Sequence, residues 1–259
     1  MARPVYAVFV AGGSGSRMGG DVPKQFLELR GVPVLERSVE RFLDAVPDAK
    51  VVIVLPDKHV DTWREICLRR GLSFPQTIVR GGMTRFHSVQ NALEKVPDGA
   101  IVSIHDAVRP LASEALIAGM VEKMREAEAT GSLAAGSGTV AAAGKGQAAM
   151  AAGLAERIKT SGVPAGLIPV IPVIDTLRSV KPGVPAPDRS TLVGVQTPQM
   201  FFSEALKEAY RQPYDVAFTD DASVAERAGF NVATVPGERF NIKITTPEDL
   251  ILADALLGL

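Results

Sequence analysis

The sequence predicts an α/β fold in which helices cover both faces of a mostly parallel sheet. Short runs of apolar, often β-branched residues alternate with segments whose apolar residues recur at helical spacing, as in residues 51–55 followed by 59–70. The first apolar run, residues 5–10, breaks abruptly into glycines, and another ends at His105 and Asp106. Such alternation is typical of parallel sheets, whose ligands bind at the carboxyl ends of the strands.

The predicted elements follow one another along the chain. Gly71 and Gly229 stand where helices typically end, and Thr246 followed by Pro247 stands where a helix typically begins. Strands are expected at residues 5–10, 51–55, 77–79, 101–104, 231–235 and 241–245. Helices are expected at residues 34–44, 59–70, 84–93, 113–129, 203–211, 221–228 and from residue 247 onwards.

One stretch predicts an arm that projects from the sheet. Pro169 and Pro172 interrupt the apolar run 167–173, which disfavours a central strand and favours an edge strand or an arm. After a turn-rich tip the chain returns as a strand at residues 191–195. A small hairpin is marginally stable alone in water, so we expect this arm, residues 170–193, to pack on another subunit.

Composition narrows the functional classes. Apolar residues make up 46% of the 259 residues and charged residues 22%, as in ordinary globular proteins. The formal net charge of −1 gives no basic field for nucleic acid or an anionic membrane. Cys67 is the only cysteine, so an internal disulfide is excluded, and no apolar run approaches the roughly 18 residues of a membrane span. We expect a cytoplasmic protein with neither nucleic acid nor membrane as a partner.

The glycine-rich turn after the first strand predicts an anion site. Gly12, Gly13 and Gly15 allow a sharp turn and leave backbone N–H groups open to an anion. Arg17 and Lys24 follow closely and supply positive charge. A strand that ends in amide donors and cations suits a polyphosphate.

Two commoner phosphate loops do not fit this turn. The Walker pattern requires Gly-Lys-Ser/Thr, which is missing near Gly12, and the third glycine of the dinucleotide pattern falls on Met18. A plain surface turn would explain the glycines alone. Arg17 and the Pro-Lys-Gln-Phe sequence at residues 23–26 argue against that alternative.

Residues 11–18 (Ala-Gly-Gly-Ser-Gly-Ser-Arg-Met) and 23–26 resemble the signature of the polyol-phosphate cytidylyltransferases, in particular those acting on 2-C-methyl-D-erythritol 4-phosphate. The resemblance implies a Rossmann-like sheet of the nucleotide-diphospho-sugar transferase type, as one domain over residues 1–259. It implies transfer of CMP from CTP to 2-C-methyl-D-erythritol 4-phosphate with release of pyrophosphate. The alanine- and glycine-rich residues 130–166 read as an insertion in this family, with a helix possible at about 147–159.

The resemblance assigns two groups of residues to CTP. Arg17 and Lys24 would bind the triphosphate and stabilise the transition state, the fork of arginine beside the compact charge of lysine. The glycine-rich segment and the second motif, Gly-Gly-Met-Thr-Arg-Phe-His-Ser at residues 81–88, would hold the rest of the nucleotide. These CTP-binding residues are Ala11, Gly12, Gly13, Ser14, Gly15, Gly82 and Ser88. For Ser88 the alternative is a hydrogen bond back to its own helix.

The resemblance assigns a third group to the acceptor. Arg189 and Lys243 would grip the acceptor phosphate and aim it at the α-phosphorus of CTP. The polyol-phosphate residues would be Asp106, Arg109, Thr176 and Thr197. Because Thr176 and Arg189 flank the arm, the resemblance places them in the site of a neighbouring subunit, which implies a homodimer. A turn-stabilising role is the alternative for Asp106, and a solvated surface position the alternative for Arg189.

The chain offers few candidates for a covalent nucleophile, and this suits a phosphate acceptor. A phosphate monoester is largely a dianion near neutral pH, because its second pKa is about 6, and needs no base to attack. Catalysis would then rest on positioning and charge stabilisation, with Mg²⁺ or another divalent cation on the phosphates; its protein ligands are not apparent. Alternatives are a ribitol-5-phosphate cytidylyltransferase and a non-catalytic nucleotide-sensing subunit, whereas Met18 disfavours a dinucleotide oxidoreductase.

Overall fold

A central sheet of eight strands organises the part of the chain that the computed structural model describes, residues 2–12, 22–130 and 145–258. Its strand order is β10-β7-β9-β6-β1-β4-β5, and β8 is added along β7. The parallel half contains β1 (Val5–Val10), β4 (Lys50–Leu55), β5 (Gln76–Arg80) and β6 (Ile101–Asp106). The other half contains β7 (Gly166–Pro172), β8 (Val193–Val195), β9 (Gln199–Phe202) and β10 (Val232–Pro236). In it, β10 lies parallel to β7, whereas β9 lies antiparallel between β6 and β7. The predicted mostly parallel α/β fold is confirmed.

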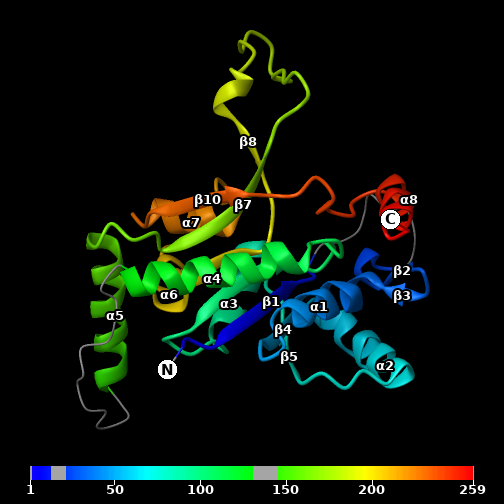
Figure 1. Ribbon diagram of the computed structural model, residues 1–259, viewed down its shortest axis with the longest axis horizontal. Helices are drawn as coiled ribbons and strands as arrows, with labels where there is room; N and C mark the ends of the chain where they lie inside the picture. Colours follow the sequence, from blue (N-terminus) through cyan, green and yellow to red (C-terminus); the bar gives the residue numbers. More distant parts are fainter. Residues whose placement is uncertain (1, 13–21, 131–144, 259) are drawn as a thin grey trace.

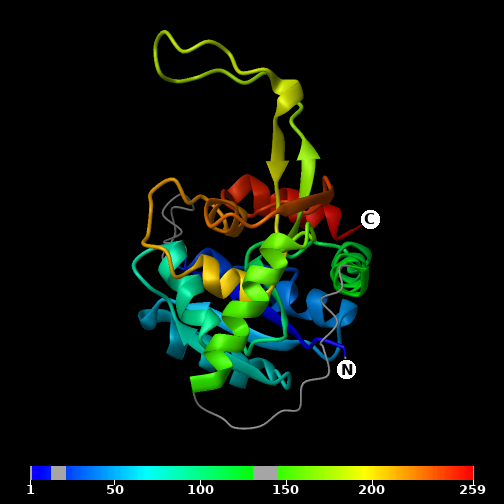
Figure 2. The same ribbon diagram turned by 90° about the vertical axis from the view of Figure 1, so that its left-hand side faces the viewer.

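Helices lie on both faces of this sheet (Figure 1). On one face α1 (Val34–Ala45) packs against α4 (Glu114–Thr130), and on the other α3 (Arg85–Leu93) packs against α6 (Ser203–Ala209), as Figure 2 shows. The remaining helices are α2 (Val60–Arg70), α5 (Lys145–Thr160), α7 (Asp221–Arg227) and α8 (Pro247–Leu256). Short elements complete the fold: β2 (Glu28–Leu29), β3 (Val32–Pro33), and the 3₁₀ helices η2 (Lys24–Phe26), η3 (Asp57–His59) and η4 (Arg189–Thr191).

The helix ends follow the sequence signals. Gly71 ends α2 in the left-handed conformation, with φ at +66°, which glycine adopts without a steric cost. Thr246 and Asp249 form a capping box around the first turn of α8, with Pro247 at its first position. Such ends fix where each helix starts and stops, and they hold the helices against a core in which Phe9 and Trp63 are fully buried.

The strand β7 is more central than its prolines predict. Its residues Gly166 and Leu167 pair with β9, and the strand also pairs with β10, so its first half lies inside the sheet. Pro169 is tolerated because it falls between Leu167, the last residue paired with β9, and Val170, the first paired with β8. A residue without an N–H costs no ladder hydrogen bond at such a break.

The second half of β7 does project, together with β8, as an arm that extends far from the sheet (Figures 1 and 2). Beyond the paired residues the chain forms an irregular tip that ends in η4. Val180 in this tip is fully exposed, and Val184 is half exposed. The expected return strand at 191–195 is therefore shorter, because Arg189–Thr191 form a 3₁₀ turn with Asp188 as its cap.

The predicted strand at residues 241–245 is wrong. These residues form no strand, because their hydrogen bonds go to loops rather than to a neighbouring strand. The Ile244 N–H donates to the Val108 carbonyl at 2.9 Å, and the Asn241 side chain donates to the Thr197 carbonyl at 2.9 Å. The segment thus connects β10 to α8 beneath the ends of β6 and β9.

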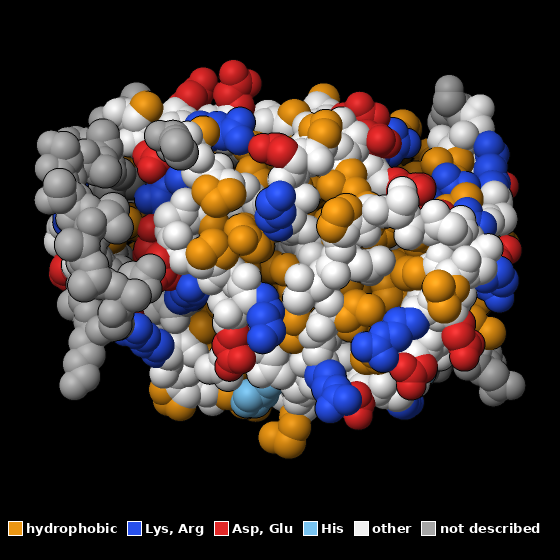
Figure 3. All heavy atoms as spheres, turned by 90° about the horizontal axis from the view of Figure 1, so that it is seen from below, with side chains coloured by type: hydrophobic (Ala, Val, Ile, Leu, Met, Phe, Trp, Pro, Cys, Tyr) orange, Lys and Arg blue, Asp and Glu red, His pale blue; other side chains and the backbone are white. Residues whose placement is uncertain are grey.

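The predicted helix near residues 147–159 is confirmed as α5, which lies against α6 with Ala155 and Ile158 buried. Residues 131–144 of the expected insertion lie outside the described residues. No helix in the described ranges is both long and apolar enough to cross a membrane. On the face shown in Figure 3, basic and acidic side chains are interspersed with apolar ones.

Candidate functional site

The site lies where β1 and β6 end side by side. Val10 is paired in register with Asp106, and the Ala107 N–H donates to the Val10 carbonyl at 3.2 Å. The Ala11 N–H continues the ladder to Val54 at 2.9 Å. The two strands therefore deliver the start of the glycine-rich segment and the Asp106 carboxylate to one edge of the sheet, the edge at which α/β proteins bind ligands.

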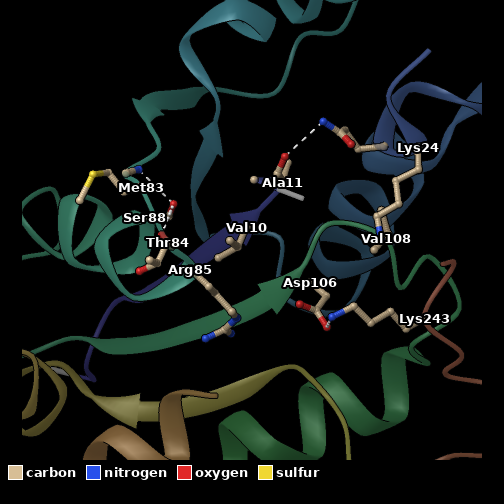
Figure 4. A pocket seen from close by; sticks show the side chains of 13 residues that line it. Val10, Ala11, Lys24, Met83, Thr84, Arg85, Ser88, Asp106, Val108 and Lys243 are labelled. Atoms are coloured by element: carbon tan, nitrogen blue, oxygen red, sulfur yellow. Dashed lines mark hydrogen bonds and ion pairs between the residues drawn. The ribbon is translucent and has the colours of Figure 1, made fainter. Parts of the chain in front are cut away.

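A first cavity of about 250 Å³ opens at this edge. Figure 4 shows Lys24 and Lys243 on one side of it and Met83 and Thr84 on the other. Its walls combine backbone from two loops with three cationic side chains and one carboxylate. The lining residues are Val10, Ala11, Gly12, Lys24, Gln25, Gly82, Met83, Thr84, Arg85, Ser88, Asp106, Val108 and Lys243.

The Pro-Lys-Gln-Phe segment forms η2 and locks one wall of the first cavity. The side-chain amide of Gln25, which is buried, donates to the Ala11 carbonyl at 3.1 Å. The Lys24 ammonium donates to the Ile244 carbonyl at 3.2 Å, which holds it beside the loop that carries Lys243. Buried amides are normally hydrogen-bonded, and this bond ties η2 to Ala11 at the end of β1.

The opposite wall is the turn before α3. Thr84 caps that helix by accepting from the His87 N–H, and the Ser88 hydroxyl donates to the Thr84 carbonyl at 2.9 Å. The same hydroxyl accepts from the Gly82 N–H at 3.1 Å. A Cβ on Gly82 would lie 2.4 Å from that of His87, so only glycine fits there. The back-bonding alternative for Ser88 is thus observed, although the residue also lines the cavity.

Asp106 stands between the cations of the site. Its Oδ2 accepts from the Lys243 ammonium at 3.0 Å and from the Arg109 Nε at 3.2 Å. Burial alone would raise the pKa of this carboxyl, but the positive charges of Lys243, Arg85 and Arg109 hold the pKa well below its ordinary value. Asp106 is therefore a carboxylate near neutral pH.

A second cavity, of about 260 Å³, lies on the other side of Asp106. Thr197 anchors it, because its Oγ1 accepts from the Asp106 N–H at 2.9 Å and lies 2.9 Å from His105 Nδ1. The lining residues are Arg85, Asp106, Arg109, Val195, Gln196, Thr197, Gln199, Thr219, Asp220 and Lys243. Asp106, Lys243 and Arg85 line both cavities, so the two cavities share one wall.

Comparison with known proteins identifies the family. The chain matches the family model described as 2-C-methyl-D-erythritol 4-phosphate cytidylyltransferase over residues 5–151 and 147–258. It is 44% identical over 259 residues to the protein of that name from Porphyromonas gingivalis, covering 99% of both chains. It is 39% identical to that from Phocaeicola vulgatus, covering 97% of this chain and 99% of the relative. The chain belongs to the methylerythritol phosphate cytidylyltransferase family.

A solved structure shows that the fold is shared. The crystal structure of 4-diphosphocytidyl-2C-methyl-D-erythritol synthase from Anaerococcus prevotii superimposes with a TM-score of 0.71. The alignment covers 99% of both chains at 24% sequence identity. The cytidylyltransferase fold predicted by resemblance is thus confirmed, including the mixed sheet with helices on both faces.

The fold of this cytidylyltransferase family member brings most of the predicted site residues together. The first cavity is lined by Ala11, Gly12, Lys24, Gly82 and Ser88 among the residues predicted for CTP. The second is lined by Arg109 and Thr197 among those predicted for the acceptor, and Asp106 and Lys243 line both. Gly13, Ser14, Gly15 and Arg17 lie outside the described residues. The binding roles of all these residues stay predictions.

Two predicted residues lie away from both cavities. Thr176 and Arg189 are exposed on the arm, where the Arg189 guanidinium donates to the Ile174 carbonyl. The fold of a single chain therefore does not assemble the complete set predicted for the acceptor. An arm that delivers them to another subunit stays a prediction.

Sequence reasoning missed the polar residues that support the site. Arg85 lies in the second motif and Gln25 in the Pro-Lys-Gln-Phe sequence, whereas Gln199 lies in neither, and none of the three has a predicted role. Partners elsewhere in the chain hold them: Arg85 pairs with Asp221, Gln25 donates to the Ala11 carbonyl, and Gln199 donates to Asp220. For Arg85 and Gln25, the place within a motif is the available signal.

The described residues hold no cluster of three or more side chains of the metal-binding kinds. Among the described residues, Asp106 is the acidic side chain on the first cavity, and Asp220 joins it on the second. One or two carboxylates beside a phosphate site fit Mg²⁺, which commonly keeps waters and substrate phosphates as its other ligands. A Mg²⁺ ion that enters with a triphosphate is compatible with these walls, whereas a closed protein cage is not present in the described ranges.

Proposed function

We propose that this enzyme transfers CMP from CTP to 2-C-methyl-D-erythritol 4-phosphate and releases pyrophosphate. Membership of the cytidylyltransferase family supports the reaction, and the relatives carry that activity in their names. The observation that carries the proposal is the pair of cavities that meet at Asp106 and Lys243. CTP would occupy the first cavity and the polyol phosphate the second, with their phosphates at the common wall.

The residues of the chain act by holding and orienting the two anions. Lys24 and Lys243 neutralise charge that builds up as the acceptor phosphate approaches the α-phosphorus. Asp106 keeps Lys243 and Arg109 fixed through its ion pairs, so that these cations need not reorganise during the reaction. A direct, in-line attack by the acceptor dianion needs no covalent nucleophile from the chain, and the described walls of both cavities contain no cysteine or histidine.

A divalent cation, Mg²⁺ in our proposal, would accompany the triphosphate. When bound, it would neutralise phosphate charge and help orient the α-phosphate for attack. Asp106 is the side chain that would hold it on the first cavity, because it is the carboxylate there.

The arm supports a homodimer. Thr176 and Arg189 are exposed on this arm, which projects from the sheet, and in a dimer they would complete the acceptor site of the other subunit. An apolar residue as exposed as Val180 is more favourably placed against a partner than in water. We also propose a cytoplasmic location, in keeping with substrates that are small, charged metabolites.

A coupled assay of pyrophosphate release tests the proposal. The purified full chain would be mixed with CTP, Mg²⁺ and either 2-C-methyl-D-erythritol 4-phosphate or ribitol 5-phosphate. We expect rapid release with the first acceptor and slow release with the second. Turnover of ribitol 5-phosphate alone would identify the enzyme as a ribitol-5-phosphate cytidylyltransferase. Binding of CTP without release for either acceptor would favour a nucleotide-sensing protein, and a nucleotidyl–enzyme adduct would contradict direct attack.

A further inference from the structure

Arg85 reaches both cavities from the first residue of α3. Its side chain keeps 29% of its exposure, and the side chain lines the walls of both cavities. In Figure 4 it extends below Val10 toward the side where Asp106 lies. It follows directly on the turn of residues 81–84, and its side chain is shared by the first and second cavities.

The Arg85 guanidinium is held rigidly from behind. It binds Asp221 in a bidentate ion pair, with Nη1 2.9 Å from Oδ1 and Nη2 2.5 Å from Oδ2. Asp221 is fully buried, and its Oδ1 also accepts from the Tyr210 hydroxyl at 2.6 Å. A fork-to-carboxylate pair with a third donor fixes the plane of the guanidinium as well as its position.

This arrangement leaves donors for a ligand. A guanidinium has five N–H groups, and within the described residues the only acceptor that Arg85 meets is the Asp221 carboxylate. The remaining N–H groups belong to a side chain that forms part of both cavity walls. Because Asp221 already neutralises the positive charge, these donors suit uncharged oxygens, whereas the acceptor phosphate has Lys243 and Arg109 available.

We propose that Arg85 is a specificity-determining residue that donates hydrogen bonds to the hydroxyl groups of the polyol chain of the acceptor. The inference rests on the proposed function. It adds which part of the substrate, the hydroxyl groups, this wall of the second cavity recognises. Gln199, Thr219 and Asp220 line the same cavity and supply the donors and acceptors that hydroxyl groups need. A site built to bond hydroxyls rejects analogues that lack them, since its polar groups would be left unpaired.

The test compares two ligands in one variant, Arg85→Lys. The first ligand is 2-C-methyl-D-erythritol 4-phosphate, measured by KM and kcat. The second is butyl phosphate, which has the phosphate without the hydroxyls, measured as a competitive inhibitor against the acceptor. We expect kcat/KM for the polyol phosphate to fall about 10- to 100-fold, the usual cost of losing charged hydrogen bonds. The inhibition constant of butyl phosphate and the KM for CTP should change less than about threefold.

Arg3→Lys is the matched control. Arg3 is also buried and pairs with a buried carboxylate, Glu204, at 2.8 Å, but it lines neither cavity. The Arg3→Lys variant should lower thermal stability. It should leave unchanged the ratio of kcat/KM for the polyol phosphate to the affinity for butyl phosphate. Tyr210→Phe removes only the hydrogen bond to Asp221. It should lower the ratio of kcat/KM for the polyol phosphate to the affinity for butyl phosphate, as Arg85→Lys does, but by less. If Arg85→Lys does not fold, Tyr210→Phe takes its place in the test.

Two outcomes would overturn the inference. One is that kcat/KM for the polyol phosphate and the affinity for butyl phosphate fall by the same factor. Arg85 would then support the site as a whole rather than recognise the hydroxyl groups. The other is a loss confined to the KM for CTP. Failure of the proposed function is distinct, since the wild-type protein would then release no pyrophosphate with any polyol phosphate.

Discussion

Single side chains set the electrostatics of this site. Asp106 gathers two cations within 3.2 Å, and the Lys24 ammonium donates to the Ile244 carbonyl at 3.2 Å. The protein therefore concentrates positive charge at one point although its net charge is −1. Local placement, rather than a general positive field, must account for the binding of polyanions.

Lys24→Ala should lower kcat by about 100-fold or more with little change in stability, because a single preorganised charge at a reacting phosphate contributes on that scale. The measurement is kcat by pyrophosphate release, with the melting temperature recorded beside it. Lys207→Ala, which removes a lysine paired with Asp98 on the surface, is the control and should leave kcat unchanged. A near-normal kcat for Lys24→Ala would reject its assigned role.

His105 makes stability depend on pH. Burial lowers its pKa to about 4 despite the nearby negative charge of Asp106. In the unfolded chain a histidine has a pKa of about 6.5, so between pH 6.5 and 4 the unfolded state binds a proton that the folded state does not. The free energy of unfolding should thus fall by up to about 1.4 kcal/mol per pH unit as the pH drops through this window.

The check is a series of denaturant titrations from pH 7 to pH 4.5 for the wild type and His105→Gln. The variant should show a shallower decline of the free energy of unfolding over that range. His87→Gln, which removes a half-buried histidine from α3, controls for the loss of a histidine as such. Parallel declines for the wild type and His105→Gln would rule out His105 as the source.

At the scale of elements, the turn before α3 shows how a local shape becomes a binding wall. Gly82→Ala would push a Cβ against His87 and move the turn. We expect the KM for CTP to rise at least about tenfold and stability to fall by roughly 1–3 kcal/mol, as for other steric insertions in packed sites. Gly119→Ala in α4 is the matched control, because a Cβ there meets open space and alanine favours a helix. Unchanged CTP kinetics for Gly82→Ala would show that this turn does not hold the nucleotide.

Local signals predicted the elements well where they agreed with the packing. The cap of α8 and the alternation of β1, β4 and β6 needed only neighbouring residues. The place of Pro169 inside the sheet could not be predicted in this way, because it depends on where two other strands stop and start. The same holds for residues 241–245, whose hydrogen-bond partners come from residues far away in the chain.

The residues of the candidate site show the same difference between local signals and distant partners. Motif spacing was enough to select Lys24, Gly82 and Asp106, all of which line the first cavity. It could not show that Arg85 is held by Asp221, because 136 residues separate the two. Sequence reasoning finds cavity-lining residues that belong to a motif, and it misses those whose orientation depends on a distant partner.

At the scale of the whole molecule, the question is whether the arm completes the site of its own chain or that of a partner subunit. If the arm completes the site of a partner, two defective variants should rescue each other. Lys24→Ala and Arg189→Ala would each be inactive, but a mixed dimer would contain one site with both residues intact. Random reassociation of equal amounts should restore about a quarter of wild-type activity, from half the dimers with one of two sites each.

The measurement is pyrophosphate release after co-refolding or co-expression of the two variants, compared with each variant alone. The control mixes Lys24→Ala with Gly82→Ala, whose defects lie on opposite walls of the first cavity of one chain. In that mixture every site would take its whole cavity from one defective chain, so no rescue is expected. Absence of rescue with Arg189→Ala as well would indicate that the arm serves its own subunit or none.

The wall shared by the two cavities limits how this enzyme could be redesigned for other sugar phosphates. A substitution at Asp106 or Lys243 intended for a new acceptor would also change the first cavity, where we propose that CTP binds. Mutant libraries should instead begin at Gln199, Thr219 and Asp220, which border only the second cavity. Selection at those three positions could broaden the range of products while the cytidylyl donor stays the same.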